Sequence, residues 1–183
     1  PARFRQVAAI GKVRVFENPS ALGPAFVVPR RGAVVETDDR RTLARLLDPA
    51  FDPRVNVLVA SRLPELPVRP THPAGSGPPH VGVETPTAGR VRVDVVVDEP
   101  SVVVLSESHY PGWRVAVDGH PRPLLRVDYA FLGVAVEPGA HLVEFTFAPV
   151  SVRVGATVSS AGVLILLGLV VTAARRRRHG APE

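Results

Sequence analysis

The chain contains no cysteine and no methionine, and aromatic residues make up only 5% of its 183 residues. Without cysteine it can form no disulfide bond, carry no thiolate nucleophile and build no zinc site with cysteine ligands. A chain that begins at Pro1 and has no methionine is expected to be a fragment of a longer protein. The chemistry of that longer protein is then expected to lie partly outside this chain.

Positive charge is unevenly distributed along the chain. The formal net charge is +5, but four positive charges belong to the run Arg175–Arg178 near the C-terminus. A nucleic-acid-binding domain spreads its basic residues over the surface that faces the nucleic acid. The charge pattern therefore argues against a nucleic-acid partner, because the basic run lies beside an apolar segment instead.

That apolar segment, residues 154–174, has no charged residue and reads VGATVSSAGVLILLGLVVTAA. A helix of this length is roughly 31 Å long, which matches the hydrocarbon core of a bilayer. Its Ser and Thr residues can bond back to helix carbonyls. We predict one transmembrane helix over residues 154–174, with the lipid bilayer as a partner. The alternative, a buried helix of a soluble domain, is disfavoured by the length and by the arginines that follow.

The flanking residues predict the orientation of this helix. Arg153 precedes the span, and Arg175, Arg176, Arg177 and Arg178 follow it. The positive-inside rule places the larger number of arginines in the cytoplasm. Residues 175–183 are therefore expected to form a basic cytoplasmic tail of a protein in the bacterial cell membrane, with the N-terminal part extracytoplasmic.

Small residues line one face of the predicted span, at Gly155, Ser159 and Gly162. Such a stripe lets two helices pack closely in lipid. Other transmembrane helices of a parent protein are therefore candidate partners. A single anchor with incidental small residues explains the sequence equally well.

Residues 90–150 are expected to form an antiparallel β-domain. Runs such as RVRVDVVV, WRVAV and HLVEFTFA alternate apolar and polar residues with the period of two that is typical of strands. Asp118-Gly119 indicates a tight hairpin turn, because both residues tolerate positive φ. Six short strands at this spacing predict a mainly β fold, namely an antiparallel β-sandwich or jelly-roll-like domain.

Residues 1–61 are expected to form a mixed α/β segment. The runs KVRVFEN, AFVVPR and VNVLVA indicate strands. Asp38 or Asp39 can cap a short helix that has Leu43, Leu46 and Leu47 on one side. Residues 62–89 are rich in proline and glycine, which predicts a mostly unstructured loop or linker.

The residues that could carry chemistry do not form a recognisable catalytic pattern. Ser106, Glu107 and His109 are residue types of a catalytic triad, but they lie close together on one extended stretch, and no Gly-x-Ser-x-Gly motif is present. The six histidines lack the spacing of a metal site. Asp38-Asp39 is explained more simply as a helix cap than as a carboxylate pair. We therefore predict no catalytic residue, metal site or cofactor in this chain.

Two aromatic residues, Tyr110 and Trp113, surround the turn Pro111-Gly112. They could stack against a sugar ring, since flat apolar rings match the faces of carbohydrates. The favoured alternative is structural, with Trp113 buried against the sandwich. Under either reading the residues expected nearby are Arg114, Tyr129 and Phe131.

Residues 102–149 resemble the C-terminal extracytoplasmic domain of the YfhO family of bacterial membrane proteins. An upstream segment, residues 13–28, also resembles a segment that is often seen in such proteins. His109 departs from the family, which often has an aromatic residue there. The residues that carry the resemblance are Tyr110-Pro111-Gly112-Trp113, Val117-Asp118-Gly119, Arg126, Tyr129-Ala130-Phe131, Gly139, His141, Val143, Phe145 and Pro149.

The resemblance implies a large polytopic parent protein, similar to GT-C-type glycosyltransferases that use polyprenyl-phosphate sugars. In that fold the catalytic carboxylate lies in an early extracytoplasmic loop, which this chain lacks. The chain alone is therefore expected to be non-catalytic and to support the membrane-embedded core or help hold a cell-envelope glycan or polyprenyl-linked sugar. The alternative is an independent membrane-anchored carbohydrate-binding module.

Overall fold

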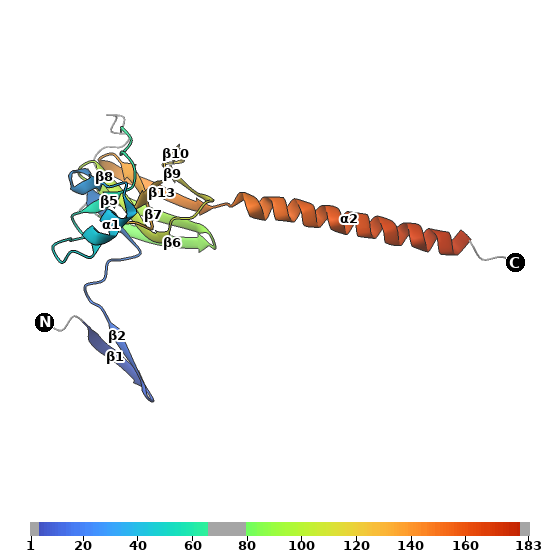
Figure 1. Cartoon of the computed structure of the whole chain (residues 1–183), viewed down its shortest axis with the longest axis horizontal. Coiled ribbons are helices and arrows are strands. Elements are labelled where there is room, and N and C mark those ends of the chain that lie inside the picture. The colour runs from blue at the N-terminus through green and yellow to red at the C-terminus, as the bar shows by residue number, and fades with distance from the viewer. Residues whose placement is uncertain (1–3, 66–79, 180–183) are drawn as a thin grey trace.

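The computed structural model describes residues 4–65 and 80–179, and shows a β-sandwich from which one long helix projects (Figure 1). A five-stranded sheet, in the order β10-β9-β13-β7-β6, packs against a six-stranded sheet in the order β3-β8-β12-β11-β5-β4. The strands of the first sheet are β6 (His80–Thr87), β7 (Arg90–Val97), β9 (Trp113–Val117), β10 (His120–Arg122) and β13 (Gly139–Phe147). Those of the second are β3 (Ala25–Pro29), β4 (Ala33–Val35), β5 (Val57–Val59), β8 (Ser101–Ser108), β11 (Leu125–Val127) and β12 (Phe131–Val136).

The inner core lies between the two sheets and consists mostly of valine. Strand β7 shows how the sequence builds it, because its alternate residues are buried and the residues between them are more exposed. On β13, Phe145 is the largest side chain of this core and is fully buried. The mainly β fold predicted from the period of two is therefore confirmed.

An outer core covers the far face of the six-stranded sheet. Strand β8 is buried on both faces, since Val103 and Leu105 join the inner core whereas Val102 and Val104 join the outer one. This explains why the run SVVVL does not alternate in polarity. The sandwich therefore has a third, smaller layer, formed by the segment between β4 and β5.

That segment contains the short helix α1 (Asp39–Leu46). Asp38 is the N-cap, because its Oδ1 accepts hydrogen bonds from the N–H groups of Arg40 and Arg41 at 2.9 and 3.0 Å. The predicted apolar side of the helix is not buried, since Leu47 is 81% exposed and Leu43 is also exposed. The loop that follows the helix brings Phe51 over the sheet beside Leu46 instead.

The domain boundaries differ from those expected in two respects. The segment 1–61 is not a separate unit, because β3, β4 and β5 complete the six-stranded sheet. The predicted loop 62–89 ends in a strand, since β6 pairs antiparallel with β7 along the edge of the other sheet. Pro86 is tolerated there because β6 is an edge strand and its register shifts between Glu84 and Thr87. Residues 66–79 of that predicted loop lie outside the described residues.

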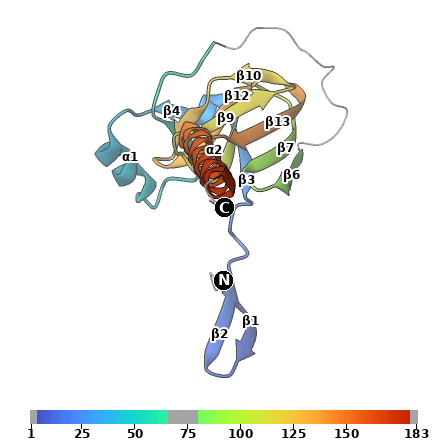
Figure 2. The same ribbon diagram turned by 90° about the vertical axis from the view of Figure 1, so that its right-hand side faces the viewer.

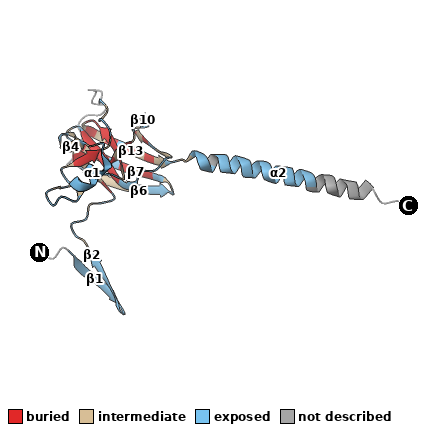
Figure 3. Cartoon of the chain, viewed as in Figure 1, coloured by how far each residue is buried: buried red, intermediate tan, exposed pale blue. Residues whose placement is uncertain are grey.

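A hairpin of β1 (Arg5–Ile10) and β2 (Val13–Glu17) stands apart from the sandwich (Figure 2). Within the described part of the chain, its two strands pair only with each other. Every residue of both strands is exposed, including Ile10 and Phe16, as the pale blue hairpin in Figure 3 shows. The sequence predicted only the second of these strands.

The C-terminal helix α2 (Val150–His179) leaves one end of the sandwich and points away from it (Figure 1). Residues 150–169 are long and apolar enough to cross a membrane, and none of that stretch is buried inside the chain. Thr157 and Ser160 donate their hydroxyl hydrogens to the carbonyls of Val154 and Ala156 at 2.8 Å. A membrane-length C-terminal helix is thus confirmed, and its backbone continues through Arg175–Arg178.

Candidate functional site

The turn Tyr110–Trp113, called the corner below, lies where the sandwich meets α2. Gly112 has a φ of 116°, a conformation that favours glycine, and a Cβ atom built on it would lie 2.9 Å from the Cα atom of Pro149. The N–H of Ala148 donates a hydrogen bond to the carbonyl of Gly112 at 2.8 Å. The corner therefore holds Ala148-Pro149, the two residues that connect β13 to α2.

The two rings of the corner have different environments. Trp113 is half-buried against the inner core, and its ring centroid lies 5.3 Å from that of Phe147, its partner residue on β13. Tyr110 is 65% exposed. A two-ring sugar platform needs both rings exposed, but only Tyr110 is mostly exposed. The geometry therefore favours a structural role for Trp113.

The three residues expected beside Trp113 lie in three different environments. Arg114 is exposed on the outer face of the five-stranded sheet, opposite Thr146. Phe131 packs against the outer core, on the other sheet. Tyr129 lies in the turn that precedes β12, next to Ala130, whose carbonyl accepts a hydrogen bond from the N–H of His109 at 2.6 Å. Phe131 therefore lies on a different sheet from Trp113, although it is in register with Ser108, two residues before Tyr110.

The turn before β12 contains two residues with left-handed backbone. Asp128 and Tyr129 have φ angles of 45° and 72°, which is uncommon outside glycine and costs free energy. Arg126 stabilises this turn, because one of its nitrogens donates to the carbonyl of Tyr129 at 3.0 Å and the other lies 2.7 Å from the carboxylate of Asp39. Arg126 therefore offsets part of the free-energy cost of the left-handed backbone in this turn.

Asp128 is a buried carboxylate within this turn. Its Oδ1 atom accepts a hydrogen bond from the N–H of Leu58 at 2.8 Å, and its own N–H donates to the carbonyl of Leu58. Burial raises the pKa of Asp128 above its ordinary value of 3.8, although the hydrogen bond from Leu58 acts in the opposite direction. The side chain therefore joins β5 to β11 at the cost of a buried charge.

Asp128 also lines a cavity of about 520 Å³ on the outer side of the six-stranded sheet. The cavity is mostly apolar, with Phe26, Phe51 and Phe131 in its wall and Arg54 among its polar members. Apolar concavities with a few polar groups are typical of small-molecule sites. The sequence did not predict this site, because its residues come from five separate segments.

A polar network lies on the side of the sandwich opposite α1, in the five-stranded sheet. The buried ring of His141 contacts the carboxylate of Asp118 through Nδ1 at 2.7 Å and the carbonyl of Glu137 through Nε2 at 3.0 Å. The other oxygen of Asp118 accepts from the N–H of Leu142 at 2.9 Å. Both groups that the imidazole contacts, a carboxylate and a carbonyl, are hydrogen-bond acceptors. The network ties the β9–β10 hairpin to the turn between β12 and β13.

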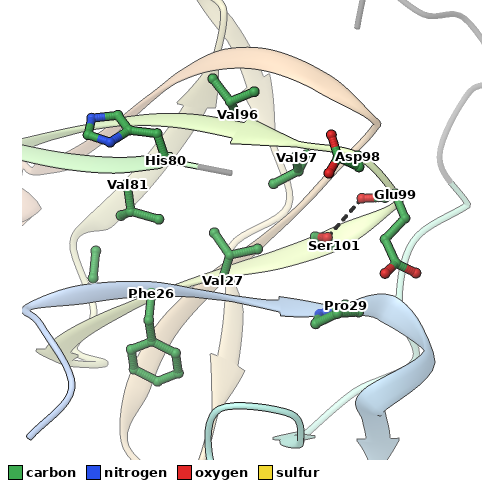
Figure 4. Close-up of a pocket in the computed structure, with 11 residues that line it drawn as sticks. Phe26, Val27, Pro29, His80, Val81, Val96, Val97, Asp98, Glu99 and Ser101 are labelled. Atoms are coloured by element: carbon green, nitrogen blue, oxygen red, sulfur yellow. Dashed lines mark hydrogen bonds between the residues drawn. The ribbon is translucent and has the colours of Figure 1, made fainter. Parts of the chain in front are cut away.

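A second cavity, of about 340 Å³, opens between the edge strands β3 and β6 (Figure 4). Val27, Val81 and Val97 line its apolar part, whereas Phe26 points away from it. Ser101 donates its hydroxyl hydrogen to the carbonyl of Glu99 at 2.8 Å, and the Glu99 carboxylate pairs with Arg31. The polar side chains that have partners, Ser101 and Glu99, lie at one end of this cavity. The valines that line the rest belong to the inner core or pack against it. We therefore describe this opening as the open side of the inner core.

The residue types of a triad are not assembled in the described residues. Ser106, Glu107 and His109 are all exposed, and no hydrogen bond joins their side chains. No group of three or more His, Asp or Glu side chains that could hold a metal occurs in residues 4–65 and 80–179.

A β-sandwich joined by two residues to an apolar helix of membrane length defines a membrane-anchored β-domain. The family model described as "Bacterial membrane protein YfhO" matches residues 80–159, from β6 through the first third of α2. Residues 80–159 of the chain are therefore similar to the YfhO family of bacterial membrane proteins.

Part of the chain is also similar to a protein of the same description. The protein described as "Uncharacterized protein YfhO" from Bacillus subtilis (strain 168) is 28% identical over 92 residues, which cover 50% of this chain and 10% of the relative. The chain therefore spans about a tenth of that relative's length. No solved structure matches the chain.

Proposed function

We propose that this chain is the C-terminal β-domain and last membrane helix of a YfhO-like glycosyltransferase that modifies cell-envelope glycopolymers. In this proposal the sandwich is extracytoplasmic, residues 175–183 lie in the cytoplasm, and the catalytic carboxylate lies elsewhere in the parent protein. The donor is a sugar carried on a polyprenyl phosphate. The domain itself supports the membrane-embedded core and helps to hold the acceptor.

The observation that carries this proposal is the continuity of the family region across the corner into α2. The match does not stop at the end of the sandwich but continues to residue 159, inside the membrane-length helix. The backbone contacts between Gly112 and Ala148-Pro149 hold the sandwich directly at the start of that helix. A domain held in this way is suited to act beside a membrane-embedded active site.

The test is a complementation experiment with the full-length parent protein. Cells that lack the protein receive the wild type, a variant without residues 25–147, or the single variants Ser106→Ala and His109→Ala. We expect the two single variants to retain sugar transfer, measured as the sugar content of the envelope polymer by mass spectrometry, and the deletion to lose it. Immunoblots control for protein amount. Loss of transfer in His109→Ala at an unchanged protein amount would place chemistry in this chain and contradict the proposal.

A second candidate function is an independent membrane-anchored carbohydrate-binding module. The cavity of about 520 Å³ favours it, because aromatic walls with Arg54 and Asp128 are suited to a sugar ring and its hydroxyl groups. Glycan binding by the full chain in lipid nanodiscs tests this function. Binding that is lost in Phe131→Ala but kept in Trp113→Ala, with both variants folded, would place the ligand in the cavity and not at the corner.

A further inference from the structure

Two exposed arginines flank one strand at the end of the sandwich nearest α2. Thr146 on β13 is in register with Arg90 on β7 and with Arg114 on β9, so the three residues form one row across adjacent strands. In β7 and β13 the neighbouring residues 91 and 145 are buried in the core, which places this row on the outer face of the sheet. With two strand spacings between them, the backbones of Arg90 and Arg114 lie about 10 Å apart.

Neither guanidinium has a partner among the described residues. Within residues 4–65 and 80–179, no side-chain hydrogen bond or ion pair engages Arg90 or Arg114. The arginine in the next row behaves differently, because Arg92 lies 3.0 Å from the carboxylate of Glu144. Glu84 is in register with Arg92 and belongs to that next row as well. The row nearest α2 is therefore the one that retains uncompensated positive charge.

The position of this row relative to α2 places it at a membrane surface. Thr146 precedes Val150, where the apolar stretch of 20 residues begins, by four residues. The uncharged stretch begins at Val154, about one helical turn after Val150, so the boundary of the roughly 30 Å hydrocarbon core lies between Val150 and Val154. The headgroup layer beyond that boundary is roughly 5–7 Å thick. Pro149 lies in this layer, and the contact between Gly112 and Pro149 brings the corner to the same depth.

The side chains at this end suit a lipid surface. Tyr110 is exposed and Trp113 lies beside it, and these two residue types are enriched where proteins meet lipid headgroups. An arginine binds a phosphate oxygen pair with its planar fork of donors. The acidic residue nearest to Tyr110 in sequence is Glu107, three residues before it and on the other sheet.

We propose that Arg90 and Arg114 bind the phosphates of anionic lipid headgroups while Tyr110 and Trp113 lie in the interfacial layer, so that this end of the sandwich docks on the membrane that α2 crosses. This inference depends on the membrane helix and not on glycosyl transfer. It holds whether the domain supports an enzyme or acts as a binding module.

The chain carries its own probe for this docking, because Trp113 is its only tryptophan. The full chain is placed in nanodiscs that contain lipids with a nitroxide quencher on the headgroup, with either anionic or zwitterionic lipid as the remainder. We expect strong quenching of Trp113 in the anionic discs. Arg90→Gln and Arg114→Gln should each lower the docking equilibrium constant about fivefold, as expected for one basic residue near an anionic surface.

Matched variants separate docking from unfolding. Arg40→Gln removes the same charge from an exposed position on α1, far from α2, and should leave quenching unchanged. Arg90→Lys and Arg114→Lys keep the charge and should retain most of the quenching, and circular dichroism verifies that each variant is folded. Equal quenching in anionic and zwitterionic discs, or quenching that the two Gln variants do not reduce, would overturn phosphate binding. An unquenched Trp113 in every disc would overturn docking itself.

Discussion

At the scale of single residues, Asp128 shows how a polar side chain is used inside the outer core. Its hydrogen bond to Leu58 fixes β5 beside the turn before β12, but the charged form loses hydration. Because the folded state holds the proton more tightly than the unfolded state, the stability that this group contributes falls as pH rises above 3.8.

Asp128→Asn is therefore expected to stabilise the chain at neutral pH. The amide oxygen can still accept from Leu58, asparagine tolerates the positive φ, and no charge is buried. The gain over the wild type should vanish below pH 3.8, where the wild-type carboxyl is protonated in both states. Denaturant unfolding of the full chain in detergent, followed from pH 3 to 8, measures this.

The variant Asp128→Ala is the control, because it removes the hydrogen bond to Leu58 and should lower the free energy of unfolding by about 1 kcal/mol. A wild type more stable than Asp128→Asn at pH 7 would contradict the argument.

Two glycines with positive φ provide a matched pair at the corner and at the next hairpin. A Cβ at Gly112 would lie 2.9 Å from the backbone of Pro149, whereas a Cβ at Gly119 would meet nothing within 4 Å. We expect Gly119→Ala to cost about 1 kcal/mol through backbone strain alone, and Gly112→Ala about 2–4 kcal/mol because the connection to α2 must also move. Thermal unfolding of both variants compares them. Equal costs would mean that the contact with Pro149 contributes nothing.

At the scale of elements, α1 begins at a pair of aspartates with different roles. Asp38 caps the helix through two backbone N–H groups, whereas Asp39 pairs with Arg126 at the surface. Asp38→Ala should cost about 1 kcal/mol, the usual value of an N-cap, and Asp39→Ala less, because exposed ion pairs contribute little. Chemical denaturation of the two variants tests the order. A larger loss for Asp39→Ala would assign the main stabilising role to its contact with Arg126.

The hairpin of β1 and β2 lacks the packing that keeps a strand pair stable. Isolated two-stranded hairpins are marginal in water, and this one buries none of its residues against the sandwich. Its backbone amides should therefore exchange with deuterium at least 100-fold faster than those of β7 and β13, because they need only local opening. Exchange followed by mass spectrometry on the full chain measures the difference. Comparable protection would mean that a further surface covers the hairpin.

At the scale of the whole molecule, the sequence was most informative where one local signal decides the structure. The alternating valines of β7 and the Asp118-Gly119 turn each predict an element correctly, and the apolar C-terminal run predicts a helix of membrane length, which the structure has over residues 150–169. Strand β6 was missed because its proline and the proline-rich residues before it resemble a linker. Strand β4 was missed because its three residues are too few for a periodic signal, whereas the run VNVLVA predicted β5.

The candidate sites could not be predicted in the same way. Arg90 and Arg114 become neighbours only through β13, which lies far from both in sequence but between them in the sheet. The cavity beside Asp128 likewise combines distant segments. The corner was recognised from sequence as a turn with a tryptophan, but its contact with Pro149 depends on the three-dimensional path of β13.

The absence of cysteine makes the membrane orientation directly measurable. A single cysteine replaces Ala50, in an exposed loop of the sandwich, or Ala181, in the tail, and intact cells are treated with a membrane-impermeant maleimide. The distribution of arginines predicts labelling at position 50 and none at position 181 until the cells are opened. The unmodified chain is the control for background labelling. The reverse pattern would mean that the sandwich lies in the cytoplasm.

The two-residue connection between β13 and α2 has a mechanical consequence. The connection is only two residues long, and Gly112 lies against both of them, through the hydrogen bond from Ala148 and the close approach to Pro149. A rotation or tilt of α2 in the membrane would therefore change the orientation of the whole sandwich.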